Sequence, residues 1–196
     1  MNKEERADDV IQFFNNTIKD LNERTNNIPD EEKSSVYIGG IAYKGPHGFK
    51  STEPAYPPFE FINANNVANG MGTDHADASK ESIIEWDPEL VFVDLSTYGT
   101  QPSAVEQIRT DPAYQSLTAV EEGEVYGVLP YNWYTKNYGT VLANAYYLGT
   151  VINPERFSDI NPEEKANEIY KFLVSEPVYE DLEKGFGRGY GKIPVN

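Results

Sequence analysis

The sequence predicts an α/β fold, a three-layer α/β/α sandwich with a mainly parallel sheet of about four to five strands, preceded by a long N-terminal helix. Two observations support this. Residues 90–93 form an uninterrupted apolar run, which is typical of a strand that is buried on both faces of a parallel sheet. Such runs alternate along the chain with amphipathic helical segments. The 196 residues are enough for one domain with a real core.

The first half of the chain predicts one helix, one clear strand and a long loop. Residues 3–27 carry apolar side chains at helical spacing, and Pro29 follows the predicted end of that helix. Residues 35–42 indicate a buried strand. A loop rich in glycine, proline and aromatic residues then spans residues 43–58, and connections of this length are usually functional or disordered. Residues 59–62 indicate a short strand.

The second half repeats the alternation of strand and helix. Ser79 is a plausible N-cap for the next helix, and the strand at 90–93 follows. Pro102 is expected to open a helix that runs to about Arg109. The remaining elements expected are a strand at 125–129, a helix at 137–152, a helix from Pro162, and a helical segment near 177–184. The glycine-rich residues 185–191 are expected to be irregular.

Composition excludes several classes of partner. The net charge is −16, whereas nucleic acid and anionic membranes require a basic surface. The chain has no cysteine, so it has no disulfide and no thiolate-bound metal. No apolar run approaches the roughly 20 residues that span a bilayer, so we expect no membrane insertion. The first six residues are too charged for a signal peptide, so any leader is expected to lie outside this chain.

Catalytic and metal motifs are also missing from the sequence. The glycines of residues 185–189 lack the preceding strand and following helix of a phosphate-binding loop. The two histidines, His47 and His75, lie in predicted loops without the spacing of a dedicated zinc site, although either could cap a chelated metal. No GxSxG elbow is present, and the carboxylates lie on charged helix faces. We therefore expect no catalytic residue, no resident metal and no cofactor; the chain is not expected to be an enzyme.

Aromatic residues follow the ends of three predicted strands. In open α/β sheets, ligands bind at the carboxyl ends of the strands, and flat amphipathic side chains there can hold a bulky organic ligand without reacting with it. Lysines in the same loops could bond the polar edge of an anionic ligand. The ligand contacts expected from these loops are Tyr43, Lys44, His47, Phe49, Tyr98, Tyr131, Asn132, Trp133 and Tyr134.

Two stretches carry a family resemblance. Residues 79–93 resemble a helix with the pattern S-x-E followed by a proline, an acidic residue and a buried strand, and residues 119–126 resemble an A-V-x-x-G-x-V-Y run before a last strand. The chain thereby resembles the C-terminal lobe of the periplasmic solute-binding proteins of ABC importers, in the class that carries iron–siderophore complexes, haem and cobalamin. The resemblance implies that residues 1–30 are the helix connecting two lobes and that residues 31–196 are the C-terminal ligand-binding lobe. The N-terminal lobe has no counterpart in the sequence.

The resemblance also implies roles for particular residues. Asn132 and Trp133 stand where cobalamin-binding members carry an acidic residue and a tryptophan that touch the ligand, and the amide of Asn132 departs from that pattern. His75 matches a second ligand contact. Glu81 matches the glutamate that docks on arginines of the membrane permease. The partners implied are an ABC permease and a small-molecule metal chelate, at the periplasmic or extracellular face of the membrane.

Two alternatives remain open at this point. One is a tetrapyrrole or metal chelatase, which would need a histidine–glutamate pair, and His75 with Glu81 is the candidate. The other is a protein-interaction module without a small ligand, in which the aromatic loops bind protein.

Overall fold

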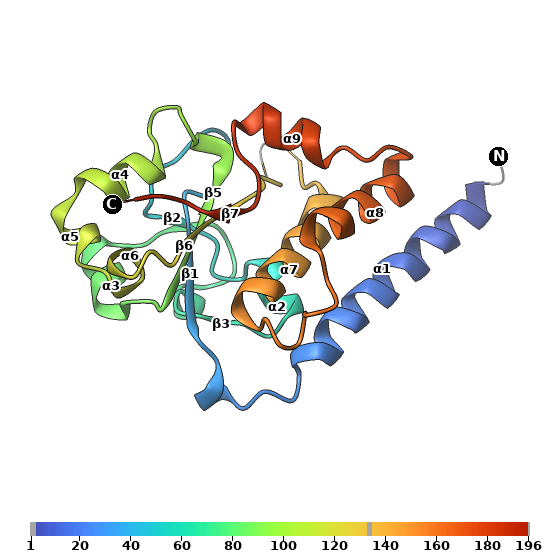
Figure 1. The fold of residues 1–196 in the computed structure, drawn as a ribbon, viewed down its shortest axis with the longest axis horizontal. Helices are drawn as coiled ribbons and strands as arrows, with labels where there is room; N and C mark the ends of the chain where they lie inside the picture. The colour runs from blue at the N-terminus through green and yellow to red at the C-terminus, as the bar shows by residue number, and fades with distance from the viewer. Residues whose placement is uncertain (1–2, 133–134, 196) are drawn as a thin grey trace.

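A computed structural model describes residues 3–132 and 135–195. Its centre is a five-stranded sheet in the order β3-β1-β5-β6-β7, in which the first four strands are parallel and β7 is antiparallel to β6 (Figure 1). The strands of this sheet are β1 (Ser35–Gly39), β3 (Asn65–Asn66), β5 (Leu90–Asp94), β6 (Val125–Val128) and β7 (Gly191–Lys192). A separate antiparallel ribbon joins β2 (Ser51–Thr52) to β4 (Ala76–Asp77). The predicted α/β fold with a mainly parallel sheet is confirmed.

Helices cover both faces of the sheet. They are α1 (Lys3–Thr25), α2 (Pro57–Phe61), α3 (Lys80–Trp86), α4 (Ala104–Thr110), α5 (Pro112–Gln115), α6 (Thr118–Glu121), α7 (Tyr138–Ile152), α8 (Pro162–Val174) and α9 (Tyr179–Phe186). Short 3₁₀ turns lie at Asp30–Glu32, Asn69–Met71 and Leu95–Thr97. The N-terminal half of α1 contacts α8, where the guanidinium of Arg6 donates a hydrogen bond to the carbonyl oxygen of Phe172 and the ring of Phe13 stacks on that of Phe172. The buried residues of α1 lie toward its C-terminal end, and the N-terminus lies at the outer end of this helix (Figure 1). Among the described residues, no helix is both long and apolar enough to cross a membrane.

The alternation of side chains along the strands explains the three layers. Val36 and Ile38 of β1 join Phe92 of β5 in one apolar cluster, which also contains side chains of α1, α2, α7 and α8. Tyr37 and Val91, which point to the opposite face, join a second cluster with side chains of α3, α4, α5 and α6. Successive residues of a strand face opposite ways, so one sheet builds two cores.

Polar caps set the starts of several helices. The hydroxyl of Ser79 accepts a hydrogen bond from the backbone N–H of Ser82 at 2.9 Å, which confirms Ser79 as the N-cap of α3. Asn137 caps α7 in the same way. The helix expected from Pro102 begins two residues later, because the side chain of Ser103 caps α4.

One predicted element is wrong, and a second is right only in part. Residues 59–62 belong largely to the short helix α2 and not to a strand; Pro57 and Pro58 occupy its first turn, where a missing backbone N–H is tolerated. The tail at 185–191 is only partly irregular, since α9 ends at Phe186 and Gly191 begins β7. β7 pairs with the edge of β6, whose backbone groups would otherwise lack partners on that side.

Candidate functional site

The carboxyl ends of β1, β5 and β6 lie at one edge of the sheet, and the chain leaves each strand there through a loop. The first two loops touch, because the hydroxyl of Ser96 lies 3.5 Å from the carbonyl oxygen of Gly40. Gly40 has φ +75°, and a Cβ atom there would lie 2.8 Å from that of Ala104, so this close approach requires glycine. The residues predicted to bind ligand therefore follow strands that end at a shared edge.

Three of the predicted residues contact one another at this edge. The ring of Tyr43 stacks on that of His75, with centroids 4.5 Å apart and planes 9° apart. The ring of His47 lies 5.3 Å from that of His75, and its Nε2 donates a hydrogen bond to the carbonyl oxygen of Tyr43 at 2.8 Å. Asp77 joins them. We call Tyr43, His47, His75 and Asp77 the imidazole cluster.

The imidazole cluster is partly open to solvent. Tyr43 is 42% exposed, the two histidines are half-buried, and Asp77 is exposed. Burial, and then the neighbouring His47, lower the pKa of His75, so His75 is neutral at neutral pH. The ammonium of Lys44 lies 5.0 Å from the centre of the Tyr43 ring. The cluster thus presents a flat aromatic surface and two imidazole rings, with the ammonium of Lys44 beside them.

Tyr98 lies in the loop after β5, and its neighbours come from the C-terminal tail. The guanidinium of Arg188 lies 5.9 Å from the centre of its ring. Tyr98 also lines a cavity of about 350 Å³ beside α4. Its half-buried ring leaves one part accessible at the strand-end edge.

Two predicted contacts are buried instead. Phe49 is fully buried and packs edge-on against Tyr37 and Tyr114 in the core. Tyr131 is 2% exposed, and its hydroxyl donates a hydrogen bond to the carboxylate of Glu53. Neither side chain is exposed in this structure, in which both pack against neighbouring side chains.

The loop after β6 is held by an ion pair and by a backbone bridge within the loop. Lys136 Nζ lies 3.6 Å from Oε1 of Glu53, and the backbone of Lys136 forms an isolated bridge with Asn132. Asn132 is half-buried and stays available at the loop surface. Trp133 and Tyr134 lie outside the described residues.

Buried acids under this edge were missed by the sequence reasoning. Asp94 ends β5 and is 1% exposed; its Oδ1 accepts the backbone N–H of Ser96 at 2.8 Å, and its Oδ2 has no hydrogen-bond partner among the described residues. Burial raises the pKa of Asp94 to about 7. Burial also raises the pKa of Glu53, against the opposing effects of Tyr131 and Lys136. The position of Asp94 directly after an apolar run was the signal that could have found it.

Asp77 was missed too, although its spacing gives a signal. Residues two apart on an extended chain point the same way, so His75 and Asp77 share a side of the segment that enters β4. The ring of His75 is also hydrogen-bonded, with Nε2 2.7 Å from the hydroxyl of Ser51 on the neighbouring β2. Glu81, the proposed partner of His75 in a chelatase, is not part of the imidazole cluster.

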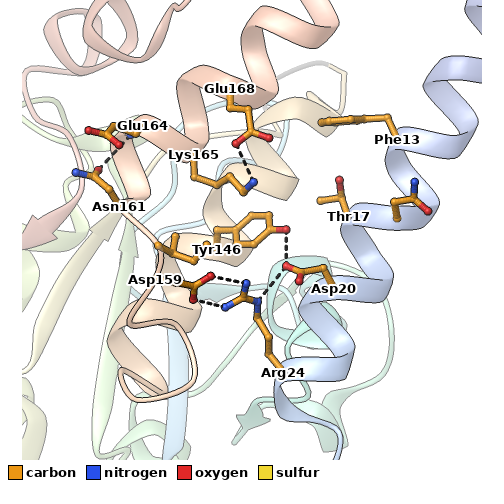
Figure 2. A pocket seen from close by; sticks show the side chains of 12 residues that line it. Phe13, Thr17, Asp20, Arg24, Tyr146, Asp159, Asn161, Glu164, Lys165 and Glu168 are labelled. Atoms are coloured by element: carbon orange, nitrogen blue, oxygen red, sulfur yellow. Dashed lines mark hydrogen bonds and ion pairs between the residues drawn. The ribbon is translucent and has the colours of Figure 1, made fainter.

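A cavity of about 570 Å³ lies between α1, α7 and α8 (Figure 2). Arg24 reaches across it from α1 and bonds both carboxylate oxygens of Asp159, at 2.6 and 2.9 Å, while its Nε bonds Asp20 at 3.0 Å. The hydroxyl of Tyr146 donates to Asp20 at 2.7 Å, and Lys165 pairs with Glu168. None of the lining residues belongs to a strand-end loop. The contacts of Arg24 with Asp159 and of Tyr146 with Asp20 hold α1 to the domain, whereas Lys165 and Glu168 both lie on α8.

The family model described as "Periplasmic binding protein" matches residues 1–131, which is more than half of the sequence. The chain belongs to this family. It is 24% identical over 174 residues to the molybdate-binding protein MolA of Haemophilus influenzae, a match that covers 86% of this chain and 47% of MolA. The chain thus spans about half the length of that relative.

Solved structures of similar proteins share the fold. The structure of MolA bound to molybdate matches with a TM-score of 0.64 at 18% identity, over 90% of this chain and 49% of MolA. An ABC transporter solute-binding protein from Sulfurospirillum deleyianum matches with a TM-score of 0.70 at 23% identity, over 95% of this chain and 58% of that one. The periplasmic heme-binding protein HutB of Vibrio cholerae matches with a TM-score of 0.56 at 18% identity, over 77% and 58%. Two of these proteins, MolA and HutB, are described as binding chemically different ligands, molybdate and heme.

Proposed function

We propose that this chain is the ligand-binding lobe of a solute-binding protein that serves an ABC importer, with residues 1–30 as the interlobe helix and residues 31–196 as the C-terminal lobe. It captures a metal chelate or macrocycle at the periplasmic or extracellular face of the membrane and releases it unchanged to the permease. Family membership supports the general role. The observation that carries the proposal is the exposed stack of Tyr43 on His75 at the carboxyl edge of the sheet.

Each accessible residue at the edge has a role in this proposal. The ring of Tyr43 provides a flat contact for a chelator or macrocycle, and Tyr98 provides a second one. Lys44 attracts an anionic solute, and Asn132 bonds its polar edge. A ligand that is clamped between two lobes loses about half of its buried area when one lobe acts alone, so this chain should bind more weakly than a two-lobed protein.

The proposed capture needs no bond-making in the ligand. Two acids beneath the edge, Asp94 and Glu53, are buried and hydrogen-bonded to loop residues. The imidazole cluster combines His75 with Asp77 and does not include Glu81, which weakens the support for a chelatase. Glu81 is exposed in the first turn of α3, where a carboxylate can pair with an arginine of a permease.

Isothermal titration of the chain with a panel of ligands tests the proposal. The panel contains ferric siderophores, haem and a corrinoid, and molybdate as an inorganic anion outside the proposed class. We expect saturable 1:1 binding of at least one of the chelates or macrocycles, with the ligand recovered intact, whereas binding of molybdate alone would contradict the proposal. Tyr43→Ala should weaken that binding about 3- to 10-fold, because an aromatic contact is lost. Ile11→Ala removes another exposed apolar side chain, on α1, and should leave the affinity unchanged. No binding by any ligand of the panel, or chemical conversion of one, would contradict the proposal.

A further inference from the structure

We propose that His47, His75 and Asp77 together bind a divalent first-row transition-metal ion directly, and that the solute's own donor atoms complete its coordination. Binding of the metal ion by these three residues is independent of the proposed function. Completion of its coordination by a solute rests on the proposed function. A solute that carries such a metal ion would be held by bonds between the metal and the protein as well as by contacts with aromatic rings.

Convergence of the three side chains is the first observation. One ring nitrogen of each histidine and one carboxylate oxygen of Asp77 all lie within 4.8 Å of one another. His47 comes from the loop after β1, whereas His75 and Asp77 come from the segment that forms β4. The pairing of β2 with β4, with Ser51 opposite Asp77, brings the two segments together.

Hydrogen bonds orient both imidazoles for metal binding. A carbonyl oxygen only accepts, so the Nε2 of His47 must carry the proton that it donates to Tyr43. Ser51 has one hydroxyl proton and donates it to the carbonyl of Ile41 at 2.7 Å, so the Nε2 of His75 is the donor toward Ser51. In each neutral ring the lone pair therefore lies on Nδ1. Histidines that bind metals usually donate their other N–H to an oxygen in this way.

The rings are also held by packing. Tyr43 stacks on His75, and the backbone carbonyl of the same tyrosine fixes His47. Ser51 is buried and tied to the backbone of Ile41, so the group that orients His75 is itself fixed. This arrangement lowers the entropy that the side chains lose when they bind an ion.

Donor chemistry selects the class of ion. Two imidazole nitrogens and one carboxylate suit zinc, nickel, cobalt or ferrous iron, whereas calcium and magnesium prefer sites made entirely of oxygen. Three protein ligands leave at least one coordination position open. Asp77 neutralises one of the two charges of the ion, so the open position favours an anionic donor. Asp77 is exposed, so a solute can reach the cluster from solvent.

Zinc ion alone is the first probe, because it is diamagnetic and the chain contains only two histidines. Nitrogen-15 NMR should show both rings as Nε2–H tautomers before zinc is added. One equivalent of zinc should then shift the two Nδ1 signals together. Nδ1–H tautomers, or no zinc-dependent change at either ring, would overturn the proposal.

Variants then test each ligand by isothermal titration with zinc and with nickel. His47→Ala and His75→Ala should each lower the affinity at least about 100-fold, since loss of outer partners alone typically lowers it roughly 10- to 100-fold. Asp77→Asn should weaken binding, whereas Asp74→Asn makes the same charge change at an exposed neighbouring position and should not. Ser51→Ala should give a smaller loss through misorientation of His75. Equal affinities for the wild type and both histidine variants would overturn the site.

The two proposals fail in different ways. Chelate binding that persists without any binding of zinc or nickel ion would refute the metal site and leave the capture function standing. Zinc binding at both histidines without binding of any panel solute would support the metal site and refute the capture of chelates. Circular dichroism of every variant shows whether it is folded, and the wild-type NMR experiment needs no variant.

Discussion

Replacement of the buried Asp94 by asparagine should remove a loss of folding stability that the wild type shows as the pH rises from about 4 to about 7. Burial raises the pKa of Asp94 from 3.8 to about 7, so the folded protein holds this proton more tightly than the unfolded chain does. The stability linked to this proton is fully present below about pH 4. It declines as the pH rises and is lost above about pH 7. Asparagine cannot ionise, so the variant lacks this decline.

The expected size follows from the two pKa values. The difference between 3.8 and about 7 corresponds to about 4 kcal/mol in total, of which about 3 kcal/mol falls between pH 5 and pH 8. The amide oxygen of asparagine can still accept the N–H of Ser96. Its two N–H groups enter a site where Oδ2 of Asp94 has no partner among the described residues, and this costs about 1–3 kcal/mol at every pH.

Urea unfolding followed by circular dichroism at pH 5, 6, 7 and 8 measures the effect. The free energy of unfolding of the variant, relative to that of the wild type, should rise by about 3 kcal/mol from pH 5 to pH 8. Glu53, whose pKa burial also raises, is present in both proteins, so most of its contribution cancels in this comparison. Parallel stability curves for the two proteins would refute the reasoning, because they would mean that Asp94 titrates alike in the folded and unfolded states.

Three further predictions concern the helices. Arg24→Met should destabilise the protein by about 2 kcal/mol in urea unfolding, because Asp159 and Asp20 lose their shared partner. As a control, Lys19→Met removes the exposed ion pair with Glu23 and should change stability by less than about 0.5 kcal/mol. Ser79→Ala should cost about 1 kcal/mol by the same assay, through loss of the α3 cap, and an unchanged midpoint would contradict that role. Glu81→Lys should lower solute uptake through a reconstituted permease without changing solute affinity, whereas Glu85→Lys, an exposed charge reversal on the same helix, should leave uptake intact.

Long elements were predictable from the sequence because they carry enough residues to show a period. The helix observed at Lys3–Thr25 and the strand at Leu90–Asp94 lie within two residues of their predicted bounds. The two-residue strands β2, β3 and β4 show no period, and pairing with distant segments defines them. Residues 59–62 indicated a strand because so short a run cannot distinguish the two-residue period of a strand from the 3.6-residue period of a helix.

The candidate site was predictable in its parts but not in its contacts. Strand-end position singled out Tyr43 and His47, and the family resemblance pointed to His75. Their mutual stacking depends on the pairing of β2 with β4, which no local pattern reveals. An aromatic residue in a loop can turn inward or outward with equal local preference. Phe49 and Tyr131 turned inward, where the core and Glu53 supply partners that lie far away in the sequence.

The central claim is that solute binds at the carboxyl edge of the sheet, and amide NMR shift mapping tests it most directly. The chain is titrated with whichever solute of the panel binds, and backbone shifts are followed residue by residue. The account predicts that the largest changes fall in residues 43–49 and 75–77. Changes centred instead on Phe13, Tyr146 and Lys165, around the cavity between α1 and α8, would contradict it.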